Sequence, residues 1–287
     1  MSALLGRIGL YGRMIRFSHS IFALPFALAS AVLAASGGVS GRQIAWILVA
    51  MVGARSAAMG FNRLADQALD ARNPRTAGRE LPRGAISRAE VWVFVLASAA
   101  TLVVAAAMLN PLCLALSPLA LAIVLGYSYT KRFTALSHAF LGLALAVAPV
   151  GAWLAIRGRL EAPPVALGLA VLFWVAGFDT IYACQDEAFD RAEGLHSLPA
   201  RFGVARALAL ARVFHLIAVA LLAAVYALAP LHPLYLVGVA AVAGLLVYEH
   251  SLVRADDLSR IDAAFFTVNG WISLGYFAVT LAARLLA

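Results

Sequence analysis

The stretch GFNRLADQALDARNPRTAGRELPRG, residues 60–84, places charged side chains at the end of a long apolar segment. Asn62, Asp66 and Asp70 recur every four residues, a spacing that puts all three on one face of a helix. Arg55 lies seven residues before Asn62, so it belongs to the same stripe, within the apolar segment. Because a charged side chain is costly against hydrocarbon, we predict that the stripe faces an interior cavity. A run of arginines follows the stripe: Arg72, Arg75, Arg79 and Arg83.

The composition around this stretch is that of a membrane protein. Of 287 residues, 63% are hydrophobic and 13% are charged, whereas soluble domains are roughly half apolar and a quarter charged. An α-helix needs about 20 mostly apolar residues to cross a bilayer, and no shift in composition marks a second domain. We therefore expect one all-α domain over residues 1–287, a polytopic membrane protein with transmembrane helices at 17–36, 43–62, 91–109, 111–129, 136–156, 163–185, 208–229, 231–250 and 263–285.

The positions of the basic residues predict the orientation. The net charge is +8, and most arginines fall in the N-terminal tail and in alternate connections between the spans. By the positive-inside rule these segments are cytoplasmic, which puts the N-terminus inside and, with nine spans, the C-terminus outside. The basic charge is thus a topology signal of a multi-pass inner (plasma) membrane protein, and we expect no nucleic acid as a partner. The opposite side carries few arginines: Arg42, Arg157, Arg159 and Arg284.

A second acidic cluster, FDTIYACQDEAFD at residues 178–190, repeats the spacing of the first. Asp179, Asp186 and Asp190 are seven and four residues apart, and they lead into another arginine-bearing segment. Two acidic stripes at the same membrane side can face each other, but their carboxylates repel unless a cation joins them. Hard oxygen ligands without thiols suit Mg²⁺, which commonly bridges carboxylates to substrate phosphates. Neighbouring arginines then suit the remaining phosphate oxygens.

Two further groups lie at the predicted cytoplasmic ends of spans. YSYTK, residues 127–131, puts Tyr127 and Lys131 one helical turn apart, and Arg16 lies at the mouth of the first span. Tyr and Lys at such positions are also ordinary interfacial anchors. For Arg55, an ion pair that braces the helices and a binding role are both open. His215 and His250 have no metal-ligand spacing.

On these motifs the chain resembles the UbiA superfamily of intramembrane aromatic prenyltransferases over nearly its whole length. The NxxxDxxxD pattern of the family matches Asn62, Asp66 and Asp70, and YxxxK matches Tyr127 and Lys131. The second aspartate motif matches Asp186 and Asp190, with Asp179 upstream. The resemblance implies nine transmembrane helices around a central cavity, two Mg²⁺ ions and a polyprenyl diphosphate donor. His196 stands where relatives often carry Lys, and it is assigned no role.

Within this resemblance, IRFSHSIFALPFAL and YACQDEAFD look most like members that prenylate 4-hydroxybenzoate in quinone biosynthesis. A closely similar branch uses a dihydroxynaphthoate acceptor in menaquinone synthesis, and the residues do not separate the two. A secondary transporter is disfavoured because its site usually lies near the membrane midplane. A CDP-alcohol phosphotransferase is disfavoured because its DGxxAR motif is absent.

The resulting hypothesis is a Mg²⁺-dependent transfer of a polyprenyl group from its diphosphate to an aromatic ring. Either Asp179 or a released phosphate oxygen could take the ring proton. The predicted catalytic residues are Asp66, Asp190 and Asp179. The predicted metal ligands are Asn62, Asp66, Asp70, Asp186 and Asp190. The predicted diphosphate contacts are Arg16, Arg55, Tyr127, Lys131 and Arg79.

Overall fold

The computed structural model describes residues 9–15 and 22–287, and within those ranges it contains helices and no strand. The predicted contact at Arg16 lies outside the described residues. The long helices are α2 (Leu24–Ala34), α3 (Gly41–Arg72), α4 (Arg88–Leu109), α5 (Pro111–Thr130), α6 (Ser137–Arg157), α7 (Ala162–Ala183), α10 (Val204–Leu228), α11 (Leu234–Ser251) and α12 (Asn269–Leu285). The short ones are η2 (Cys184–Asp186), α8 (Glu187–Ala192), α9 (Leu198–Phe202) and η3 (Ala263–Val268).

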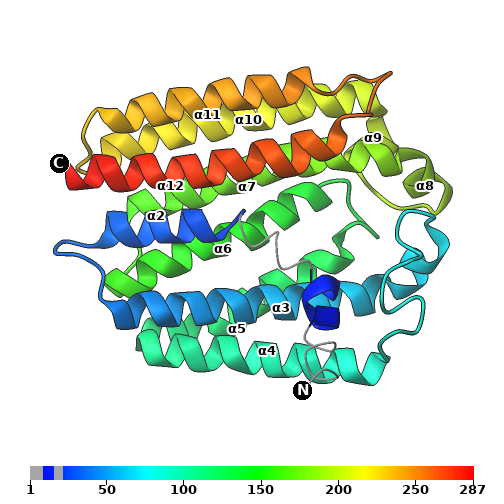
Figure 1. Ribbon diagram of the computed structural model, residues 1–287, viewed down its shortest axis with the longest axis horizontal. Coiled ribbons are helices and arrows are strands. Elements are labelled where there is room, and N and C mark those ends of the chain that lie inside the picture. The colour runs from blue at the N-terminus through cyan, green and yellow to red at the C-terminus, as the bar shows by residue number, and fades with distance from the viewer. Residues whose placement is uncertain (1–8, 16–21) are drawn as a thin grey trace.

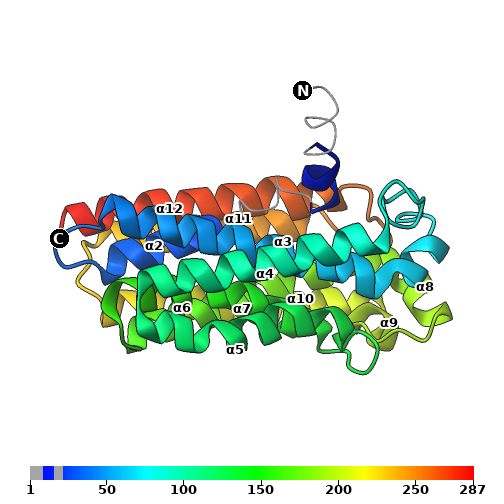
Figure 2. The same ribbon diagram turned by 90° about the horizontal axis from the view of Figure 1, so that it is seen from below.

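Among the described residues, eight helical segments are long and apolar enough to cross a membrane. They coincide with the second to ninth predicted spans, so the prediction of a polytopic all-α membrane protein is confirmed. The first predicted span contains α2, which has 11 residues and is shorter than a full crossing. The long helices run side by side along one direction (Figures 1 and 2).

Local sequence sets several helix ends. Ser40 and Gln43 form a capping box at the start of α3, and Ser87 and Glu90 form another at the start of α4. These side chains satisfy backbone N–H groups that a helix start leaves unpaired. The Asn110 side chain accepts from the Cys113 N–H and begins α5 directly after α4. Each of these N-terminal caps fixes the residue at which the chain begins its next crossing of the bundle.

The bundle has a dense half and a more open half. Helix α7 packs along α6 and α10, and 61% of the residues in its most apolar stretch are buried. Helix α5 packs on α3, α4 and α6, and only 17% of the residues in its most apolar stretch are buried. The dense half includes an aromatic cluster in which the ring centroids of Trp174 and Tyr276 lie 4.9 and 4.8 Å from that of Phe26. The open half therefore has room for a cavity.

Polar connections collect at one end of the bundle. Figure 1 shows the segment 73–87, α8 and α9 together at the right-hand end, with the C-terminus at the other end. Helix α3 continues ten residues beyond its predicted end, from 62 to Arg72, so it reaches this polar end as one unbroken helix.

A glycine allows a close contact between α6 and α7. A Cβ atom on Gly142 would lie 2.2 Å from the carbonyl oxygen of Leu172, which is backbone and cannot rotate away. Small residues of this kind let membrane helices approach closely. The close approach of α6 and α7 holds the open half of the bundle against the dense half.

We expect Gly142→Ala to lower the melting temperature of the protein in detergent. The added methyl group overpacks the α6–α7 contact, which typically costs about 1–3 kcal/mol. Gly151→Ala on the same helix is the matched control, since no atom beyond its chain neighbours and its own helix backbone lies within 4 Å of the place that its added methyl group would occupy. There the higher helix propensity of Ala should stabilise the helix by up to about 1 kcal/mol. Equal melting temperatures for the two variants would contradict this account of the packing.

Candidate active site

The first aspartate of the α3 stripe contacts two predicted site residues, Asn62 and Lys131, and also Arg132. Asp66 is 3% exposed, and its carboxylate lies 2.8 Å from Lys131 Nζ and 3.0 Å from an Arg132 guanidinium nitrogen. The Asn62 amide donates to the same carboxylate at 3.2 Å. A buried carboxylate requires such partners, because without them its desolvation is unfavourable. The structure thus brings the NxxxDxxxD stripe of α3 and the end of α5 into contact.

The third member of the stripe is held by the segment that follows α3. One guanidinium nitrogen of Arg79 lies 2.7 and 2.8 Å from the two oxygens of Asp70. The Thr76 hydroxyl donates to the Asp70 carbonyl at 3.0 Å. The segment 73–87 therefore folds back over the end of α3 and brings Arg79, a predicted diphosphate contact, to Asp70.

The second acidic cluster lies on three consecutive elements rather than on one helix. Asp179 is in α7, Asp186 ends the 3-10 turn η2, and Asp190 lies in α8. A 3-10 turn winds more tightly than an α-helix, so the spacing of seven and four does not define one straight stripe here. The turn points Asp186 toward the segment 73–87.

Asp186 connects the two clusters. The Arg75 guanidinium binds both of its oxygens, with Nε donating at 3.0 Å, and the Asn73 amide donates at 3.1 Å. Burial alone would lower the pKa of Arg75, but the hydrogen bond and charge of Asp186 outweigh it and raise that pKa. Arg75 is therefore a fixed cation between the two motifs. A second link joins Arg72 to Glu193 at 2.7 Å.

Cations thus separate the carboxylates that the sequence places near one another. Within residues 9–15 and 22–287, no group of three or more His, Cys, Asp or Glu side chains is arranged to hold a metal ion. Asp66, Asp70 and Asp186 each form an ion pair with an arginine or lysine. Without these cations the negatively charged carboxylates would repel one another. The donor set itself fits Mg²⁺, because it offers carboxylate and amide oxygens and no thiol. The predicted set consists of Asn62, Asp66, Asp70, Asp186 and Asp190.

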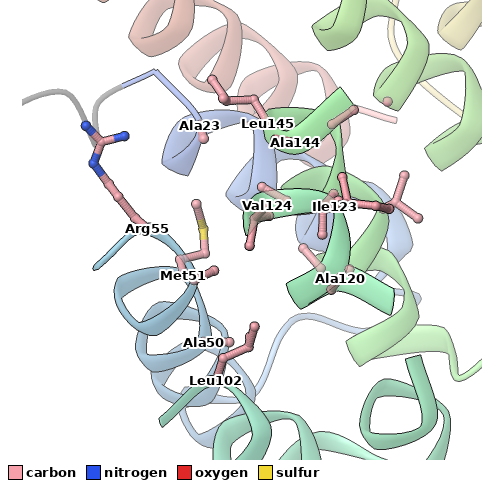
Figure 3. A pocket seen from close by; sticks show the side chains of 18 of the residues that line it. Ala23, Ala50, Met51, Arg55, Leu102, Ala120, Ile123, Val124, Ala144 and Leu145 are labelled. Atoms are coloured by element: carbon pink, nitrogen blue, oxygen red, sulfur yellow. The ribbon is translucent and has the colours of Figure 1, made fainter. Parts of the chain in front are cut away.

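The paired carboxylates Asp66, Asp70 and Asp186 form an ionic cluster at the polar end of the bundle, called the ionic end below. An apolar cavity of about 510 Å³ lies next to it. It is lined mainly by α3, α5 and α6, with Met51, Val124 and Ala144 among its walls (Figure 3). Arg55 and Tyr127 are the polar side chains where it approaches the ionic end. Arg55 lies two helical turns before Asn62, and Tyr127 lies one turn before Lys131, so the cavity and the carboxylates share two helices.

Asp179 has a partner that the sequence analysis did not identify. Its carboxylate lies 2.7 Å from Nδ1 of His138, which is buried at the start of α6. Arg132, Arg75 and Asn73 were also missed as contacts of the aspartates. The position of Arg132 beside Lys131 was a usable signal, and Arg75 lies in the arginine run. No sequence pattern pointed to His138 or Asn73.

The fold and the site define a polytopic membrane protein in which an ionic cluster of two aspartate motifs adjoins an apolar cavity. This combination suits a lipid substrate with an anionic head. Residues 23–272 match the UbiA prenyltransferase family. The chain belongs to this family, and it is a prenyltransferase; the transporter and CDP-alcohol phosphotransferase alternatives are not supported.

Known proteins cover the chain almost end to end. The 4-hydroxybenzoate octaprenyltransferase of Cupriavidus necator is 34% identical over an alignment of 288 positions, which covers 98% of this chain and 99% of the relative. The apo structure of a UbiA homologue from Aeropyrum pernix K1 is 36% identical, with a TM-score of 0.83 over 92% of this chain and 97% of that one. A UbiA homologue from Archaeoglobus fulgidus bound to GPP and Mg²⁺ is 24% identical and shares the fold, with a TM-score of 0.74 over 96% and 99% of the two chains.

The link between Arg75 and Asp186 makes a prediction about the segment 73–87. Arg75→Ala should speed amide hydrogen exchange over residues 73–80 about fivefold, as expected for losing an ion pair worth about 1 kcal/mol. Exchange measured by mass spectrometry provides the test. Arg83→Ala removes an exposed arginine from the same segment and serves as the control. If both variants exchange like the wild type, Arg75 does not hold this segment.

Proposed function

We propose that this protein transfers a polyprenyl group from polyprenyl diphosphate to 4-hydroxybenzoate in respiratory quinone biosynthesis. The observation that carries the proposal is the junction of the ionic cluster with the apolar cavity on α3 and α5. An anionic head and an apolar tail of one substrate would each find a matching environment there. The name of the Cupriavidus relative supports 4-hydroxybenzoate as the acceptor. The dihydroxynaphthoate acceptor is the alternative that the assay below distinguishes.

Mg²⁺ is the proposed cofactor. When bound, it would neutralise charge on the leaving diphosphate and so favour cleavage of the allylic C–O bond. The chemistry of the donor set supports this choice, and the Archaeoglobus homologue of the same fold was determined with GPP and Mg²⁺. Its ligands would be Asn62, Asp66, Asp70, Asp186 and Asp190.

The basic side chains are proposed to bind the diphosphate. Lys131 and Arg79 each pair with an aspartate, at 2.8 and 2.7 Å. When those aspartates bind metal, the two cations become available to phosphate oxygens. Arg55 and Tyr127, at the junction with the cavity, would contact the diphosphate from its other side. Arg16 is proposed for the same role from the sequence alone.

The apolar cavity is proposed to hold the prenyl chain and to exclude water. Its walls are almost entirely aliphatic, so burial of an isoprenoid there is favourable. An allylic cation in an open aqueous site would react with water, and an enclosed apolar one protects it. The reacting carbon would then lie where cavity and cations meet, with Asp66, Asp190 and Asp179 as the catalytic residues.

We further propose that the ionic end faces the cytoplasm, in the inner membrane. The distribution of arginines supports this orientation, with the N-terminus inside and the C-terminus outside. Residues 1–287 would act as one domain, since the proposed site draws on helices from α3 to α8.

The decisive assay incubates purified protein with Mg²⁺, a polyprenyl diphosphate and either 4-hydroxybenzoate or dihydroxynaphthoate, and identifies products by mass. Prenylated 4-hydroxybenzoate is expected, and EDTA should abolish its formation until Mg²⁺ is restored. Product from dihydroxynaphthoate alone would overturn the acceptor assignment. Turnover that persists in excess chelator would overturn the metal assignment.

The carboxylates are tested by isosteric substitution. Asp66→Asn and Asp190→Asn each remove a charge at nearly constant volume, and turnover of the folded variants should fall at least about a hundredfold. Glu161→Gln is the matched control, because Glu161 pairs with Arg159 outside the proposed site. A near-native rate in folded Asp66→Asn or Asp190→Asn protein would make that aspartate structural.

A further inference from the structure

His138 is a buried histidine for which the proposed function has no role. It lies in the first turn of α6 and is 4% exposed. Both ring nitrogens have partners. Nδ1 lies 2.7 Å from Asp179 Oδ2, and Nε2 accepts a hydrogen bond from the Leu198 backbone N–H at 3.3 Å.

These two partners define the protonation of the ring. A backbone N–H can only donate, so Nε2 must be the unprotonated nitrogen. Nδ1 then carries the proton and donates it to the Asp179 carboxylate. His138 is thereby a neutral ring with a fixed tautomer, and its Nδ1–H donates to one oxygen of the Asp179 carboxylate.

The second oxygen of Asp179 is left for another partner. Within the described part of the chain, His138 is the hydrogen-bond and ion-pair partner of this carboxylate. The Asp179 side chain is 24% exposed, whereas that of His138 is 5% exposed. The carboxylate is therefore oriented from its buried side and accessible on the other.

The pair lies between the apolar cavity and the ionic cluster. Leu141, one turn after His138 on α6, lines the cavity, as does Leu172, two turns before Asp179 on α7. On the other side, Asp186 follows Asp179 by seven residues. The His196 N–H donates to the Lys131 carbonyl at 2.7 Å, so the segment before Leu198 is also tied to the end of α5. An acceptor ring that meets the prenyl carbon would lie in this interval.

We propose that His138 is a positioning residue that holds Asp179 to receive the proton of the acceptor ring. This inference rests on the proposed function. Cleavage of the prenyl C–O bond sends its electron pair to the diphosphate, and an ortho ring carbon forms the new C–C bond. The C–H bond at that ring carbon then breaks, its electron pair restores the aromatic ring, and the proton passes to the free oxygen of Asp179. Asp179 later releases the proton to water.

The competing explanation is purely structural: the bond between His138 and Leu198 fastens α9 to α6. Two substitutions separate the roles. The amide nitrogen of His138→Asn lies near the position of Nδ1 and keeps a donor for Asp179. The amide of His138→Gln reaches the position of Nε2 and keeps an acceptor for Leu198, but it loses the donor to Asp179.

The experiment measures kcat, KM for both substrates and melting temperature for the wild type, His138→Asn and His138→Gln. We expect His138→Gln to lose kcat about tenfold or more, a part of the roughly 10²–10⁴-fold that positioned proton transfer contributes, with little change in KM for the donor. His138→Asn should keep the larger part of the wild-type kcat. The reverse order, with the rate following melting temperature, would overturn the proposal.

A ring-deuterated acceptor supplies a readout that a structural role would not change. With deuterium at the carbons ortho to the phenolic oxygen, His138→Gln should show a larger kinetic isotope effect than the wild type, because C–H cleavage becomes slower. An unchanged isotope effect in His138→Gln overturns the role of His138 while leaving prenyl transfer by the wild type intact. Absence of any prenylated product from the wild type overturns the proposed function and this inference together.

Discussion

The contact of Asp66 with Lys131 and Arg132 is the interaction on which the polar end of this protein depends. Asp66 is almost fully buried, and a buried carboxylate without partners would be strongly destabilising. Its two cations come from the end of α5, so neutralising one charge also fixes α5 against α3. The cavity walls between those helices depend on the same contact, because α5 is otherwise the least buried of the spanning segments.

The two halves of the bundle differ in packing and in content. The dense half around α7 has aromatic and aliphatic contacts that hold the helices together. The open half has the apolar cavity and the first aspartate motif. Arg75 links them, because it comes from the segment after α3 and binds Asp186 beyond α7. A binding site at the boundary of two unlike halves can combine a rigid wall with space for a substrate.

Part of the site could be predicted from sequence and part could not. Arg55, Asn62, Asp66 and Asp70 share one helix because α3 continues unbroken to Arg72, as a four-residue spacing indicates. The same spacing was misleading at Asp179, Asp186 and Asp190, where a 3-10 turn intervenes. Spacing reports the period of a helix only while the helix continues, and nothing in YACQDEAF marks its end.

By itself the sequence determined the membrane class, the eight longer spans and the identity of the charged residues. Those properties follow from local composition and from the cost of placing charge in hydrocarbon. Only the tertiary structure decided which cation each carboxylate binds. Asp186 pairs with Arg75 across 111 residues and Asp179 with His138 across 41. Such pairs depend on which helices pack together, and helix packing arises from close contacts like that of Gly142 with Leu172, which no local pattern encodes.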